Sequence, residues 1–82
     1  MSATEFIRSI INNRPWEPKQ STLNKLVQGY VQVNSYEANS IETSRKEIID
    51  AIKELQYKGE IKILAGLGWA TGDVEFIFQA NE

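Results

Sequence analysis

Cysteine and histidine are both absent from this chain of 82 residues. The lack of cysteine excludes disulfide bonds, thiolate metal ligands and cysteine nucleophiles, and the lack of histidine excludes acid–base catalysis by imidazole. A metal site made of carboxylates alone, or a serine–lysine catalyst, would be chemically conceivable, but no residue pattern supports either. We therefore expect a protein that is not an enzyme and that holds no cofactor and no metal ion.

Long apolar runs are missing as well, since no stretch of the sequence approaches the length needed to span a membrane. The first twelve residues also lack the layout of a signal peptide. The apolar fraction of 41% and the charged fraction of 24% are ordinary for a globular chain. We expect one cytoplasmic domain over residues 1–82, with no membrane contact.

Positive charge is scarce, because nine basic and eleven acidic side chains give a net charge of −2. Six basic and four acidic residues lie in positions 1–46, whereas positions 47–82 hold three basic and seven acidic residues. A phosphate-binding surface is therefore expected in the first half of the chain. The overall acidity argues against strong non-specific binding to DNA.

The strongest pattern in the sequence lies between residues 44 and 61. Ser44 and Glu47 have the spacing of a capping box, which predicts the start of a helix. One apolar stripe follows at helical spacing, formed by Ile48, Ala51, Ile52 and Leu55. Gly59 suits the left-handed residue that ends a helix, and the alternation of Ile61 and Ile63 predicts a strand after it.

The outward face of this helix can be interpreted in two ways. Lys46 and Lys53 lie on one edge and acidic residues on the other, which is typical of a solvated face with ion pairs between turns. Alternatively, residues 43–58 form a recognition helix whose first residues contact nucleic acid, namely Thr43, Ser44, Arg45 and Lys46. The charge pattern alone favours the solvated face, because a helix that only binds phosphates would carry fewer acids.

The spacing Ser44-Arg45-x-x-Ile48-x-x-Ala51-Ile52-x-x-Leu55-x-x-x-Gly59-x-Ile61 resembles a known family. It is similar to the recognition helix and wing entry of bacterial winged-helix regulators of the gluconate-repressor (GntR) type. In that family the Ser-Arg pair opens the recognition helix. The resemblance therefore implies a winged-helix fold and contact with DNA at Ser44, Arg45 and Lys46.

A first helix is expected at the N-terminus, because Ser2 and Glu5 repeat the capping-box spacing ahead of an apolar stripe. This pattern predicts a helix over 3–13, which Arg14 does not continue because the residue before a proline avoids the helical region. Trp16 follows in a connection bounded by two prolines. Packing of Trp16 over the end of the first helix is favoured over its exposure as an anchor for a partner protein.

A second helix is expected to begin after Ser21, the predicted N-cap, and to reach at least Val31. Lys19 and Lys25 flank its start, where a DNA backbone often passes in helix-turn-helix docking. They are also ordinary surface lysines. Residues 32–42 are rich in Asn and Ser and are interpreted as a loop or a frayed helical extension.

The end of the sequence predicts a β-hairpin, with strands over 61–65 and 74–78 and a long glycine-containing loop over 66–73. The loop lacks the spacing and the following helix of a phosphate-binding loop. Leu67 and Trp69 either fold back on the hairpin or form an uncharged apolar tip that docks on protein. A wing that contacts DNA normally carries Arg or Lys, and this loop ends in Asp73.

Together these patterns predict an α+β fold, a winged helix-turn-helix with three helices followed by a β-hairpin wing. The favoured function is a DNA-binding transcriptional regulator that acts as a homodimer on double-stranded DNA. Its predicted contacts are Thr43, Ser44, Arg45, Lys46, Lys53, Lys19 and Lys25. The alternative is a protein-interaction module or subunit of a larger assembly that docks through Trp16, Leu67 and Trp69.

Overall fold

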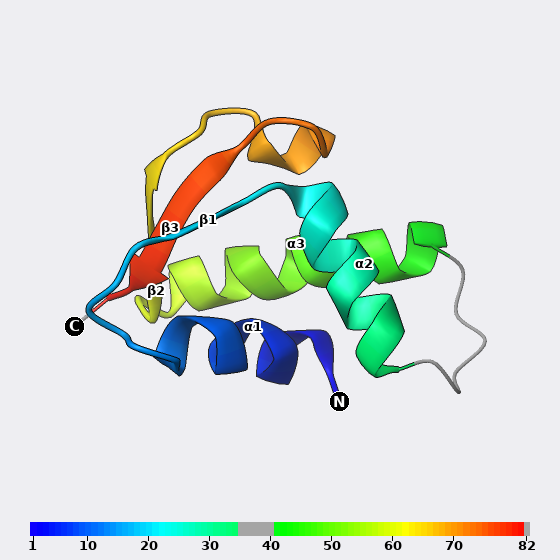
Figure 1. Cartoon of the computed structure of the whole chain (residues 1–82), viewed down its shortest axis with the longest axis horizontal. Coiled ribbons are helices and arrows are strands. Elements are labelled where there is room, and N and C mark those ends of the chain that lie inside the picture. Colours follow the sequence, from blue (N-terminus) through cyan, green and yellow to red (C-terminus); the bar gives the residue numbers. More distant parts are fainter. Residues whose placement is uncertain (35–40, 82) are drawn as a thin grey trace.

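The computed structural model describes residues 1–34 and 41–81, which form an α+β structure with three α-helices and a three-stranded antiparallel sheet. Figure 1 shows α1 and α3 running side by side under the strands, with α2 at the end where the first strand leads into it. The elements in chain order are α1 (Ala3–Asn12), β1 (Lys19–Ser21), α2 (Leu23–Val33), α3 (Ile41–Tyr57), β2 (Ile61–Ala65), the short 3-10 helix η1 (Trp69–Thr71) and β3 (Phe76–Ala80).

The first helix confirms the capping box at its start. The Ser2 hydroxyl accepts a hydrogen bond from the Glu5 backbone N–H, and the Glu5 carboxylate accepts one from the Ser2 N–H. The helix ends at Asn12, one residue before the predicted end. Its buried side chains include Phe6, Ile7 and Ile11, so the predicted apolar stripe is the core-facing side.

The N-cap of α2 is Thr22 rather than the predicted Ser21. The Thr22 hydroxyl accepts the Lys25 N–H at 3.2 Å, whereas Ser21 belongs to β1 and pairs with the last strand. Gly29 lies within α2 where that helix passes α1, and a Cβ placed there would be 3.1 Å from the Phe6 ring. The absence of a side chain at Gly29 therefore permits the close approach of α2 to Phe6 of α1.

The third helix begins at Ile41, so the prediction that Ser44 caps it is wrong. Ser44 is buried on the core side of α3, on the same stripe as the predicted apolar residues. The end of the helix agrees with the prediction. Gly59 is left-handed (φ 75°), and the N–H groups of Gly59 and Glu60 bond to the Gln56 and Leu55 carbonyls, which is the Schellman arrangement.

The predicted loop or helical extension over residues 32–42 divides between two helices at its ends. Gln32 and Val33 belong to α2, and Ile41 and Glu42 belong to α3. Residues 35–40 lie outside the described residues.

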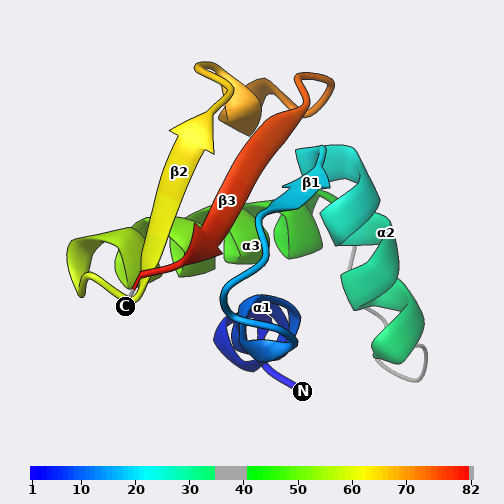
Figure 2. The same ribbon diagram turned by 60° about the vertical axis from the view of Figure 1, so that its left-hand side comes forward.

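The sheet contains the predicted hairpin and one strand that the sequence did not reveal. The strand order is β1-β3-β2, so β3 lies in the centre and pairs antiparallel with both neighbours (Figure 2). Strand β3 spans Phe76–Ala80, so the prediction that it runs over 74–78 is wrong at both ends. Val74 is 36% exposed, while Phe76, Phe78 and Ala80 face the core.

The core lies between the three helices and one face of the sheet. Its largest fully buried side chains come from every helix and from β3: Phe76, Phe78, Ile7, Leu23, Ile48, Ile52 and Leu55. Most of α3 is therefore fixed by packing on one side, and its opposite side faces solvent. Surfaces that can contact a partner include the outward side of α3, the loop between β2 and β3, and the loop that carries Trp16.

Candidate interaction surfaces

The first turns of α3 are fastened to the loop between β2 and β3. The Arg45 guanidinium donates a hydrogen bond to the Thr71 carbonyl and packs against Gly72, which is buried. On the other side of Gly72, its carbonyl accepts the Asn24 N–H at 3.1 Å. The Asn24 side chain also donates to the Asp73 carboxylate at 2.6 Å, so α2, α3 and the loop meet at this point.

This arrangement affects two of the predicted DNA contacts directly. Ser44 is only 2% exposed, so the prediction that its side chain contacts DNA is wrong. Arg45 is half-buried and already bonded to the loop. The physical reason is that α3 starts at Ile41, so Ser44 lies inside the helix, four residues before Ile48 and on the same buried face.

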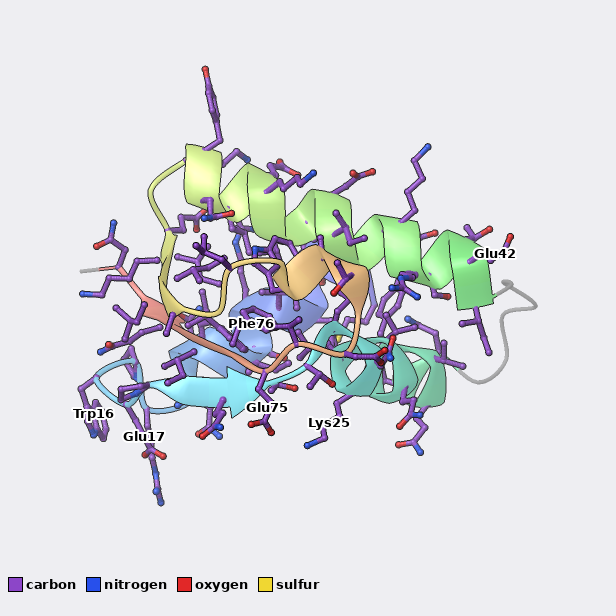
Figure 3. The ribbon with its side chains drawn as sticks, turned by 90° about the horizontal axis from the view of Figure 1, so that it is seen from above. Trp16, Glu17, Lys25, Glu42, Glu75 and Phe76 are labelled. Atoms are coloured by element: carbon purple, nitrogen blue, oxygen red, sulfur yellow. The ribbon has the colours of Figure 1, made fainter. Side chains whose placement is uncertain are left out.

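The other predicted DNA contacts lie on two sides of the molecule. Thr43, Lys46 and Lys53 are exposed along α3. Lys25 points from the first turn of α2 on the side opposite α3 (Figure 3). Lys19 is half-buried, and its ammonium donates to the Arg14 carbonyl at 3.1 Å. These cations do not form one continuous positive surface.

Acidic side chains accompany the exposed lysines of α3. Glu42 and Asp50 are exposed on α3 with Lys46 and Lys53, and Asp73 and Glu75 are exposed at the end of the loop. DNA binding draws its affinity from neutralising phosphates with several Lys or Arg residues. On the face formed by α3 and the loop, basic side chains and carboxylates occur in about equal number.

A shallow apolar cavity of about 340 Å³ lies where the end of β2 and the loop approach α3, and we call it the wing hollow. Its described lining residues are all uncharged: Gln56, Ile63, Leu64, Ala65, Gly66, Leu67, Gly68 and Trp69. The Leu67 side chain is 99% exposed, and that of Leu64 is 50% exposed. The wing hollow is therefore a region of apolar surface at the edge of the sheet.

Trp69 supports the wing hollow from beneath. Its ring is half-buried, packs against the core and stacks on Phe76 with a centroid distance of 5.3 Å. Phe76 in turn stacks on Phe78 at 4.9 Å. The two residues of the loop therefore differ: Trp69 folds back on the hairpin, whereas Leu67 is exposed.

Trp16 is 69% exposed, so the prediction that it packs over the end of α1 is wrong. The loop that carries it is nevertheless well held. The Gln79 side chain donates to the Trp16 carbonyl at 2.8 Å, and the Glu17 N–H donates to the Arg14 carbonyl at 2.9 Å. Because these bonds fix the backbone, the indole projects at the end of the molecule away from Glu42 (Figure 3).

A second cavity, about 460 Å³ in volume, lies between α2 and α3, and we call it the α2–α3 groove. It is lined by Asn24, Val27, Gln28, Val31, Gln32, Ile41 and Arg45. This groove was not predicted from the sequence. The repeat of amide side chains at every fourth position of α2, together with the valines beside them, was the signal that could have indicated it.

An ion pair joins α1 to the start of β2, away from these surfaces. Arg8 donates to both oxygens of Glu60, at 3.2 and 2.9 Å. The hydrogen bonds from Arg8 hold the pKa of Glu60 below its ordinary value. At the start of α1, hydrogen bonds from Ser2 likewise lower the pKa of Glu5. Both groups stabilise the fold and lie outside the candidate surfaces.

Comparison of the chain with family models, curated proteins and solved structures finds no match. In the part of the chain that the structure describes, no three acidic side chains gather in a way that could hold a metal ion. None of the described helices combines the length and apolar composition needed to cross a bilayer. The function must therefore be inferred from the surfaces themselves.

Proposed function

We propose that this chain is a winged-helix domain that acts as a protein-interaction module, and that the wing hollow is its docking surface. The order helix, strand, helix, helix, strand, strand supports the winged-helix assignment, as does a sheet in which the last strand lies between the other two. The loop over residues 66–75 corresponds to the wing. Because one architecture can serve DNA readers and protein adaptors alike, the surface has to decide between them.

The fastening of Arg45 to the wing is the observation that carries this proposal. A recognition helix needs its first residues free to enter the major groove. Here Ser44 is buried, and the guanidinium of Arg45 bonds to the Thr71 carbonyl. The wing itself offers Leu67 and an uncharged hollow where a DNA-binding wing would carry cations.

Exposed leucine side chains at the wing can contribute binding energy to docking. Full burial of a leucine side chain contributes about 1.5–3 kcal/mol, and Leu67 is 99% exposed in the isolated chain. Leu64 adds a further half-exposed side chain beside it. Residues whose truncation costs about 2 kcal/mol or more dominate the energy of most interfaces. The wing hollow therefore offers one anchor and an apolar surface that surrounds it.

A second copy of the chain is the partner that we propose for the wing hollow. Because its described lining residues carry no charge, two copies can approach face to face without repulsion, although each chain has a net charge of −2. A contact of one surface with itself around a two-fold axis is the commonest form of oligomer. The homodimer expected from the sequence would then form through the wing rather than on DNA.

Sedimentation velocity over a range of concentrations tests this proposal. We expect the wild-type chain to self-associate, Leu67→Asp to remain monomeric and Val33→Asp to behave as the wild type. Val33 is a matched control because it is 54% exposed at the end of α2 and does not line the wing hollow. Association that persists unchanged in Leu67→Asp, or a wild-type chain that stays monomeric, would refute the wing hollow as a dimer interface.

DNA binding is the second candidate function, and the exposure of Thr43, Lys46 and Lys53 along α3 favours it. Titration with duplex DNA at several salt concentrations distinguishes the two functions. Neutralisation of phosphates makes log K fall linearly with log salt. If Lys46→Gln and Lys53→Gln each reduce that slope by about one, the α3 surface binds DNA and the protein-interaction proposal fails.

A further inference from the structure

We propose that the α2–α3 groove binds a helical segment of a partner protein that carries apolar side chains and one carboxylate, and that Arg45 pairs with this carboxylate. This inference rests on the proposed function as an interaction module. It concerns a different surface from the wing hollow, because the two cavities share no lining residue.

The walls of the groove are apolar with a rim of amides. Val27 and Val31 stand one turn apart on α2, and Ile41 of α3, which is 70% exposed, faces the same space. Asn24, Gln28 and Gln32 form the adjacent row of α2 and can donate and accept hydrogen bonds. A ligand would therefore bury apolar side chains and meet neutral hydrogen-bonding groups along its edge.

Arg45 is the only charged residue among the described residues that line the groove. Its guanidinium has five N–H donors, and the Thr71 carbonyl accepts from Nη2. Within residues 1–34 and 41–81, Arg45 forms no ion pair. The neighbouring Asp73 carboxylate instead accepts a hydrogen bond from Asn24.

The contacts of Arg45 hold it in a position that suits a carboxylate. Packing against the buried Gly72 and the bond to Thr71 restrict the side chain, so less entropy is lost when a ligand binds. A planar guanidinium with remaining donors is best matched by a carboxylate, which can accept two parallel hydrogen bonds. The charge of the groove is thus complementary to an acidic ligand.

The shape of the groove favours a polypeptide over a small molecule. Its volume of about 460 Å³ falls within the range of ligand sites, about 300–1,000 Å³. Gln28, Gln32 and Ile41 are all exposed, so the groove faces solvent at these residues and would leave a small ligand there in contact with water. An amphipathic helix laid into a hydrophobic groove buries one face and keeps the other solvated.

Selection of a phage-displayed library of 14-residue peptides on the whole chain tests the inference. We expect the enriched peptides to carry Asp or Glu three or four positions from Leu, Ile or Phe. Each is then synthesised with a fluorescent label, as a matched pair that differs only by Glu→Gln at the acidic position, and measured by fluorescence anisotropy. The loss of a charged hydrogen bond predicts binding about tenfold weaker or more for the Gln peptide.

Variants of the chain locate the binding site. Gln28 is exposed, so Gln28→Glu adds a negative charge to the groove without disturbing the core. Repulsion of the peptide carboxylate should weaken binding of the acidic peptide about tenfold. Gln56→Glu makes the same change in the wing hollow and should have no effect on this peptide. In Arg45→Met, checked for folding by circular dichroism, the two peptides of a pair should bind equally, because the partner of the carboxylate is gone.

Several outcomes would overturn the inference: no enriched peptide, enriched peptides without an acid, or binding that is weakened by Gln56→Glu and not by Gln28→Glu. A small organic acid that binds the groove as tightly as the peptides would also overturn the assignment to a protein segment. Self-association through the wing is measured separately by sedimentation. Failure of the groove proposal therefore leaves the wing proposal intact, and the reverse also holds.

Discussion

Replacement of Gly66 by alanine should destabilise the fold more than the same change at any exposed position of the wing. Gly66 follows β2 and has φ 106°. A Cβ at this position would lie 2.6 Å from the Phe76 Cα and 2.8 Å from the Glu75 carbonyl oxygen. Both neighbours are backbone atoms next to a strand in the centre of the sheet, so neither can rotate out of the way.

Gly68 provides a matched control for the magnitude. It has φ 84°, but a Cβ there would have no other atom within 4 Å. Gly68→Ala should therefore lower the free energy of unfolding only by the strain of a left-handed alanine, about 1–2 kcal/mol. The lower conformational entropy of the unfolded chain with alanine offsets part of this loss. Gly66→Ala adds an overlap that forces the backbone to shift, which typically costs a further 1–3 kcal/mol or so.

Urea or thermal unfolding followed by circular dichroism measures both variants. For a domain of this size, about 1 kcal/mol corresponds to a change in Tm of about 4–8 °C, so Gly66→Ala should lower Tm roughly two to four times as much as Gly68→Ala. Phe76 is 1% exposed and stacked between two aromatic rings, which leaves little room for relaxation. Equal losses in the two variants would contradict the close approach of the wing to β3.

Other substitutions test the packing and the charges in the same assay. Trp16→Ala should change stability by less than about 0.5 kcal/mol, because the side chain is 69% exposed. Trp69→Ala should cost about 2–3 kcal/mol through lost stacking and burial. Equal effects would contradict the placement of the two rings. Leu55→Ala should cost about 2–5 kcal/mol, since Leu55 is fully buried, and a loss below about 1 kcal/mol would argue against its core position. Arg8 lowers the pKa of Glu60 in the folded state, so the ion pair contributes in full above the ordinary value of about 4.5, and the contribution is lost as the pH falls through the lowered value. Stability measured from pH 7 to pH 2 should therefore decline less steeply in Glu60→Gln than in the wild type, and identical slopes would show that the pair does not contribute.

Features fixed by neighbouring residues could be predicted from the sequence. The capping box of Ser2 and Glu5, the apolar stripe of α3 and the glycine after its last turn all involve residues within one or two turns of each other. The α+β class followed from these local patterns. The same pattern misled at Ser44 and Glu47, because residues three apart also occur within a helix and the spacing does not show whether the preceding turn is helical.

Features that depend on distant residues could not be predicted. Strand β1 is the polar segment Lys19–Ser21, which has no apolar alternation and is a strand because β3 pairs with it. The exposure of Trp16 depends on Gln79, whose side chain binds the Trp16 carbonyl from the far end of the chain. In each case the decisive contact spans more than fifty residues, and no periodicity within the segment reports it.

The candidate surfaces were found only in part. Leu67 was recognised as a residue of an uncharged wing, because charge can be read directly from the sequence. The role of Arg45 was not, because its bond to the Thr71 carbonyl depends on where the wing folds. The α2–α3 groove required the relative placement of two helices, which the spacing within either helix does not define.

The position of β3 in the sheet has a consequence for the order in which the chain can fold. Both other strands pair only with β3, and it is the last element of the described chain. Helices form in about a microsecond, whereas pairing of distant strands must await closure of a long loop. The helices can therefore collapse while β1 and β2 still lack their shared neighbour, and the sheet is completed last.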